Sequence, residues 1–82
     1  MVTPLYLPRE IEVSADSSGV PDVIVRKGRQ NRIAAISNIW RIDDDWWRDE
    51  ISRMYFEVEL KNGQVMTIFQ DLVSGKWYQQ RY

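Results

Sequence analysis

The sequence predicts an all-β fold, in which short antiparallel strands are joined by hairpin turns. Three observations support this prediction. Polar and apolar residues alternate along residues 53–60, as they do in a strand with one buried and one wet face. The dipeptide Asn62-Gly63 follows at once, and this pair is the strongest short-range hairpin signal. Other short apolar runs recur at regular spacing, with turn residues between them.

The predicted strands, in chain order, are residues 10–13, 22–26, 32–42, 53–60, 65–70 and 76–82. In the first, glutamates alternate with Ile11 and Val13, the pattern of a half-buried strand. A small polar loop of residues 15–19 follows it. The second strand is a β-branched run that opens just after Pro21, where a proline costs a strand least. Residues 27–30 are predicted to form the next turn.

The third predicted strand is long, and its apolar residues do not keep to one face. Ile33, Ala35 and Ile39 share one parity, whereas Ile36, Trp40 and Ile42 share the other. A bulge or sharp bend near Ser37 and Asn38 would reconcile the two patterns. A short amphipathic helix is the alternative interpretation of this stretch.

The last three strands are more regular. Four side chains of the fourth strand point one way, and these are Met54, Phe56, Val58 and Leu60. Asn62 and Gly63 are expected to supply the two positive-φ positions of a type I′ turn. Ser74-Gly75 marks a second turn before the final strand. The whole pattern is typical of an antiparallel curled sheet or small SH3-like barrel of about six strands.

We expect one small β domain spanning residues 1–82, with residues 1–7 loosely structured. The four Trp, four Tyr and two Phe residues are expected to supply most of its stabilising buried apolar surface, because each ring can bury about 150–250 Å². The rings expected in the core are Trp40, Phe56, Phe69 and one of Trp77 or Tyr78. An exposed edge, such as that of the first or last strand, would also allow two copies to pair.

The composition argues against several chemistries. The chain has no cysteine and no histidine, which removes disulfides, thiolate and imidazole metal ligands, and nucleophiles activated by histidine. The run Asp43-Asp44-Asp45 lacks the spacing and the glycine of a calcium loop. The four glycines are isolated from one another, so no glycine-rich phosphate loop is present. We therefore expect no enzymatic activity, no metal site and no cofactor.

Residues 40–50 are the candidate binding segment. They hold three of the four tryptophans and five of the twelve acidic residues. This mixture predicts a strand that runs out into a structured loop, and such loops often carry binding residues. Two adjacent tryptophans cannot both point inward from a regular strand, so one ring is expected to be exposed as an anchor for a protein partner. The predicted protein-binding residues are Asp43, Asp44, Asp45, Trp46, Trp47 and Arg48.

Weak binding of single-stranded nucleic acid is the second interpretation. The formal net charge of −1 gives no strong overall field for nucleic acid, but basic residues cluster between positions 26 and 32. Cations for phosphate and an exposed ring for base stacking would form such a site. Its predicted residues are Arg26, Lys27, Arg29, Arg32, Arg53 and Lys76. The carboxylates near the tryptophans would repel phosphate, which favours a protein partner. A purely structural module is the third interpretation.

Membrane association is not expected. No run approaches the roughly 18 apolar residues of a membrane span. The first ten residues lack the charged and apolar regions of a signal peptide. A cytoplasmic protein is the default expectation.

One set of motifs resembles a known domain. The motifs are Trp46-Trp47, Arg53-x-Tyr55-Phe56, Asn62-Gly63, Phe69-Gln70-Asp71, Ser74-Gly75-Lys76-Trp77-Tyr78 and Arg81-Tyr82. They resemble a small bacterial domain of unknown function that also occurs as the C-terminal tail of ImuB-like proteins, which are inactive relatives of Y-family polymerases in mutagenic translesion synthesis. The resemblance covers roughly residues 40–82, and more loosely residues 21–82.

The resemblance implies a free-standing accessory module linked to DNA repair or damage tolerance, with a protein partner of the DNA-damage response. It brings no catalytic or ligand-binding residues with it. The polymerase-like domain is missing from this chain, so no polymerase or clamp-binding function is implied. Met54 also departs from the pattern, which commonly has an acidic residue at that position.

Overall fold

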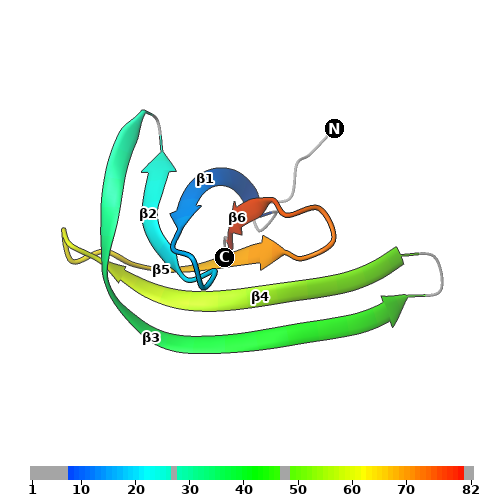
Figure 1. Cartoon of the computed structure of the whole chain (residues 1–82). Helices are drawn as coiled ribbons and strands as arrows, with labels where there is room; N and C mark the ends of the chain where they lie inside the picture. The colour runs from blue at the N-terminus through cyan, green and yellow to red at the C-terminus, as the bar shows by residue number, and fades with distance from the viewer. Residues whose placement is uncertain (1–7, 27, 47–48, 81–82) are drawn as a thin grey trace, which may run out of the picture.

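The fold is a closed barrel of six antiparallel strands (Figure 1), seen in a computed structural model that describes residues 8–26, 28–46 and 49–80. In chain order the strands are β1 (Arg9–Ala15), β2 (Pro21–Arg26), β3 (Arg29–Trp46), β4 (Asp49–Leu60), β5 (Val65–Asp71) and β6 (Trp77–Gln79). Each strand pairs with the next, and β6 pairs with β1 to close the barrel. The all-β prediction is confirmed.

The hydrophobic core fills the inside of the barrel. Its buried members come from five strands and are Ile11, Ile24, Phe56, Val58, Leu60, Met66, Ile68 and Trp77. The rings of Phe56 and Trp77 pack with their centroids 5.6 Å apart. The predicted inward set of β4 is confirmed, with Met54 packed at the margin of this core. Removing these side chains from water is the main force that holds so small a barrel together.

Two bulges explain the mixed parity of β3. Its register with β4 shifts between Ile33 and Ala35 and again between Ile36 and Asn38. Each shift adds one residue, so Ile33, Ile36 and Ile39 lie opposite inward-facing residues of β4 at a spacing of three. The predicted bulge near residues 37–38 is confirmed, and the helix alternative for this stretch is wrong.

The turn between β4 and β5 differs from the predicted one. The Leu60 carbonyl accepts a hydrogen bond from the Gly63 amide (2.9 Å), and the Leu60 amide donates to the Gln64 carbonyl (2.8 Å). Gly63 has a φ of 90°, in the left-handed region that favours glycine. The loop therefore has a tight turn followed by a left-handed residue, which is longer than a type I′ turn. The hairpin prediction is confirmed and the turn type is wrong.

The β3–β4 hairpin projects beyond the barrel. β2 pairs with β3 only from Arg29 to Arg32, and β5 pairs with β4 only from Arg53 to Glu59. β3 and β4 nevertheless stay paired as far as Trp46 and Asp49. Figure 1 shows the hairpin running past the end of β5.

The projection corrects the prediction of an acidic loop. The three aspartates Asp43, Asp44 and Asp45 belong to β3, and Asp49 and Glu50 belong to β4. Only residues 47–48 separate the two strands, and they lie outside the described residues. No helix in the described part of the chain is long and apolar enough to cross a membrane.

Candidate functional site

The outer face of the sheet carries a row of four aromatic rings across β3, β4, β5 and β6. Trp40, Tyr55, Phe69 and Tyr78 lie directly opposite one another in register, and we call this row the aromatic ladder. Its successive ring centroids are 5.3, 4.9 and 5.2 Å apart. These are the separations of favourable aromatic pairs, each worth about 0.5–1.5 kcal/mol beyond burial.

Phe69 is the centre of the ladder and is only 1% exposed, although it points away from the barrel core. Tyr55 and Tyr78 flank its ring, and the guanidinium of Arg53 lies over it at 4.8 Å. Arg53 also donates a hydrogen bond to the Tyr55 hydroxyl (3.4 Å). The molecule therefore has a second apolar cluster outside the barrel. The predicted burial of Phe69 is confirmed, but the ring lies in this outer cluster and not in the barrel core.

Trp40 is the exposed end of the ladder. Its ring stacks on Tyr55 at an interplanar angle of 7°, yet the residue is 36% exposed because β3 is the last strand of the sheet here. Ile42 lies on the same face two residues further along β3 and is 42% exposed. The prediction that Trp40 belongs to the core is wrong. Together, Trp40 and Ile42 form an exposed apolar pair on a rigid stacked base.

Acidic residues lie beside this apolar pair on the outer face. Asp44 follows Ile42 on β3, and Glu57 is the next residue on the same face of β4 after Tyr55, with Glu59 and Asp71 further away. Among the described residues, the cations near this face are already engaged, Arg53 with Phe69 and Tyr55, and Lys76 with Glu10 at 3.9 Å. Such a face repels phosphate and attracts cations. Exposed aromatic rings also attract Lys and Arg through cation–π interactions.

The opposite face of the hairpin carries a polar cluster. Asp43 accepts hydrogen bonds from Ser52 Oγ (2.7 Å) and Arg41 Nε (2.8 Å), and Arg41 Nη2 donates to Ser52 Oγ (3.3 Å). The Ser52 hydroxyl, and next the Arg41 guanidinium, hold the pKa of Asp43 below the usual aspartate value. This cluster ties β3 to β4, so Asp43 has a structural role within the hairpin.

The predicted protein-binding residues are only partly brought together. Asp43 and Asp44 point to opposite faces of β3, since they are adjacent in a strand. Asp45 and Trp46 belong to β3, but their side chains lie outside the described residues, as do Trp47 and Arg48 entirely.

The sequence interpretation missed Trp40 and Ile42 as an exposed apolar pair. A signal was present, because beyond the predicted bulge near residues 37–38 Trp40 and Ile42 have the parity opposite to that of Ile39.

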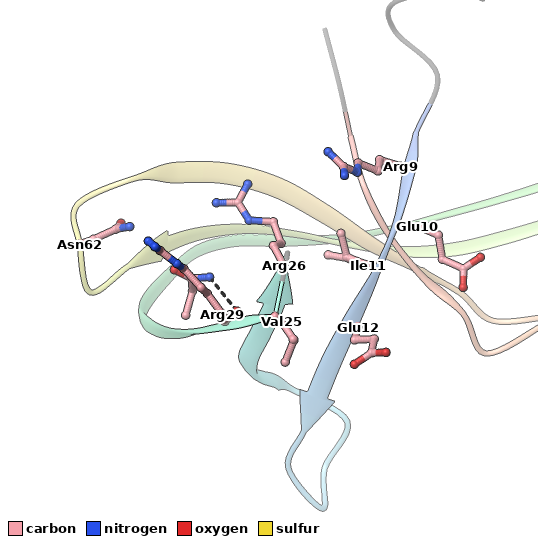
Figure 2. Close-up of a pocket in the computed structure, with 10 residues that line it drawn as sticks. Arg9, Glu10, Ile11, Glu12, Val25, Arg26, Arg29 and Asn62 are labelled. Carbon is pink, nitrogen blue, oxygen red and sulfur yellow. Dashed lines mark hydrogen bonds between the residues drawn. The ribbon is translucent and has the colours of Figure 1, made fainter.

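A basic cavity opens at one end of the barrel (Figure 2). It has a volume of about 970 Å³, and three arginines contribute to its lining, namely Arg9, Arg26 and Arg29. Glu10 and Glu12 also contribute to its lining, although in Figure 2 their side chains extend to the other side of β1 from Arg26 and Arg29. Arg26 is held in place by hydrogen bonds to Gln64 Oε1 (3.0 Å) and Gln79 Oε1 (3.4 Å).

The six residues of the predicted nucleic-acid site do not form one surface. Arg26 and Arg29 reach the cavity, whereas Arg53 covers the aromatic ladder and Lys76 lies 3.9 Å from Glu10. Arg32 is exposed on β3, and Lys27 lies outside the described residues. The basic cavity and the exposed ring of Trp40 are therefore separate features of the molecule.

In the part of the chain that the structure describes, no group of three or more carboxylates is arranged to hold a metal ion. Comparisons of the chain with models of known protein families, with curated proteins and with solved structures find no match. The physical features of the surface therefore carry the functional argument.

Proposed function

We propose that this protein is a non-enzymatic interaction module that binds a protein partner through the outer face of its β3–β4 hairpin. The observation that carries the proposal is the exposure of Trp40 and Ile42 side by side at the end of the aromatic ladder. Aromatic anchors of this kind dominate the energetics of protein interfaces. Because Tyr55 already fixes the ring of Trp40, binding costs little side-chain entropy.

The expected partner presents an apolar segment with lysine or arginine beside it. The apolar side chains would cover Trp40 and Ile42, and the cations would meet Asp44 and the neighbouring glutamates of the face. A cation over the open ring of Trp40 would add a cation–π interaction. An acidic partner or a phosphate backbone would meet like charge.

A role in DNA repair or translesion synthesis is part of this proposal. It is supported by the resemblance of residues 40–82 to the C-terminal tail of ImuB-like proteins. The aromatic ladder contains Tyr55, Phe69 and Tyr78, which all belong to the motifs that carry the resemblance. An accessory protein with a partner in the DNA-damage response fits both observations.

Selection of binders from a random displayed peptide library tests the proposal. We expect enrichment of peptides that combine apolar residues with Lys or Arg. The Trp40→Ala variant should bind the enriched peptides ~10-fold more weakly or worse, as expected for loss of an aromatic anchor. Amide chemical shifts should move along residues 40–44 and 51–55 when such a peptide is added.

The matched control is Val73→Ala, since Val73 is 62% exposed but belongs to the β5–β6 turn and not to the ladder. Its peptide affinity should equal that of the wild type. Enrichment of acidic peptides, or equal binding by the Trp40→Ala variant, would contradict the proposal.

Phosphate binding in the basic cavity is a second candidate function. The observation that favours it is that Arg26 and Arg29 lie directly opposite each other on β2 and β3. Like charges in this position are destabilising, and a bound anion would relieve the repulsion. Titration with a short single-stranded DNA at two salt concentrations tests it, because binding through phosphates weakens steeply with salt. No shift in the amides of Arg26 and Arg29 at low salt would remove this candidate.

A further inference from the structure

The free edge of β3 is the longest unpaired backbone in the described part of the chain. From Ile33 onward β3 pairs with β4 on one side, and no other described strand pairs with it. Every residue from Ser37 to Asp44 is exposed. Proteins usually shorten, cover or distort such an edge, because its amides and carbonyls are a template for another strand. The sequence pointed to the first or last strand as the edge, but these two strands pair with each other.

The regular part of this edge is the stretch from Asn38 to Trp46. Both bulges of β3 lie before it, and its register with β4 has no further shift. Bulges twist an edge away from a new partner, whereas a regular stretch can accept one. The midpoint of the regular stretch is Ile42. An antiparallel pairing of this stretch with itself about Ile42 therefore uses its full length.

The charges beside Ile42 fit that pairing. Arg41 precedes Ile42 and Asp43 follows it. The two side chains pair with each other at 2.8 Å within one copy, and each is still more than half exposed, so each also has room to meet a charge across the strand pair. About a two-fold axis at Ile42, Arg41 of each copy lies opposite Asp43 of the other. A parallel arrangement would place Arg41 against Arg41 and Asp43 against Asp43. Opposite charges across a strand pair stabilise it and like charges destabilise it.

We infer that this edge binds a second copy of the chain, with the two β3 strands antiparallel and Ile42 on the two-fold axis. This interface is isologous, as in most homodimers. It joins the sheets of both copies into one and places Ile42 against Ile42 on the outer face. Trp40 of each copy then lies diagonal to the other Ile42, within reach of an aromatic side chain. The inference does not rest on the proposed partner binding.

Cysteine cross-linking tests the geometry. The chain has no native cysteine, so any disulfide must form through the introduced residue. A residue on the axis faces the same residue of the second copy, with the two Cβ atoms about 4.5–5.5 Å apart. This is close to the Cβ separation of about 3.5–4.5 Å in a disulfide. Under mild oxidation the Ile42→Cys variant should give a covalent dimer at least ~10-fold faster than Val65→Cys, because Val65 is exposed on β5, away from this edge. Asp44→Cys, on the same face of β3, should be slower than Ile42→Cys.

Charge reversal provides the second test, by sedimentation equilibrium of the full chain. Arg41→Asp and Asp43→Arg each place like charges opposite one another, so each variant alone should dimerise ~10-fold more weakly than the wild type. Mixing the two variants restores both pairs of opposite charges and should restore the dimer. Circular dichroism of each variant establishes that it is folded.

The inference is overturned by a wild-type chain that stays monomeric up to millimolar concentration. It is also overturned by fastest cross-linking at Val65→Cys or Asp44→Cys, or by a mixture of the charge-reversed variants that associates no better than either alone. Peptide binding without self-association would leave the proposed function standing and remove only the dimer.

Discussion

Ile39 and Phe56 lie directly opposite each other on the same face of β3 and β4, yet their surroundings differ completely. Phe56 is 4% exposed and packs on Trp77, whereas Ile39 is 52% exposed. The difference arises because β5 continues the sheet beyond β4, while no described strand continues it beyond this part of β3. Burial at these two positions is therefore decided by which strands lie beside them rather than by residue type.

The two regions are also stabilised differently. The barrel end of β4 is held by the buried core. The projecting end of the hairpin is held by the stack of Trp40 on Tyr55 and by the cluster of Arg41, Asp43 and Ser52. A two-stranded hairpin alone is at best marginally stable in water, so these contacts decide how firmly the hairpin presents its outer face.

The largest expected effect is a difference in stability between alanine variants of these two opposed residues. Phe56→Ala should lower the free energy of unfolding by about 3–5 kcal/mol, because it removes a buried ring and leaves a cavity. Ile39→Ala should change it by no more than about 0.5 kcal/mol, as for exposed positions. Denaturant unfolding followed by circular dichroism measures both. Equal losses for the two variants would mean that Ile39 is covered in solution, for example by a second copy.

An intermediate effect is expected for Trp40→Ala. Loss of the stack on Tyr55 should lower the opening free energy of the hairpin by about 1 kcal/mol. Hydrogen exchange of the amides of residues 49–52 reports this opening, while the amides of β5 should keep their protection. Ile42→Ala is the matched control, since it shortens an exposed side chain on the same face without removing a ring. Loss of protection throughout β5 would show that the ladder supports the barrel as well.

The smallest effect concerns pH. Because the pKa of Asp43 is lowered in the folded state, its carboxylate stabilises the fold above the usual aspartate pKa of 3.8. This stabilisation disappears as the pH falls through the lowered folded-state pKa. The wild type should therefore exceed Asp43→Asn in stability at neutral pH, and the difference should shrink in acid. Thermal melts across this range measure it, with Asp44→Asn as the control for loss of one surface charge.

Much of the fold was predictable from particular residues. The alternation from Met54 to Leu60 predicted the inward face of β4, and the conflict of parity along β3 predicted its bulge near Ser37. The type of the turn after β4 was not predictable from the sequence. Asn-Gly occurs in more than one kind of hairpin loop, and the closing hydrogen bonds decide between them. The proposed contact surface was predicted only in part. The sequence prediction assigned binding to residues 43–48 and placed Trp40 in the core.

The sequence by itself determined the strand pattern, the inward set of β4 and the absence of histidine and cysteine chemistry, because these depend on period and residue type alone. Only the tertiary structure decided that Phe69 is buried outside the barrel and that Trp40 is exposed. The physical reason is that burial depends on which strands lie beside a residue. Pairing between distant strands assembled the ladder from β3 to β6 and left the edge of β3 free.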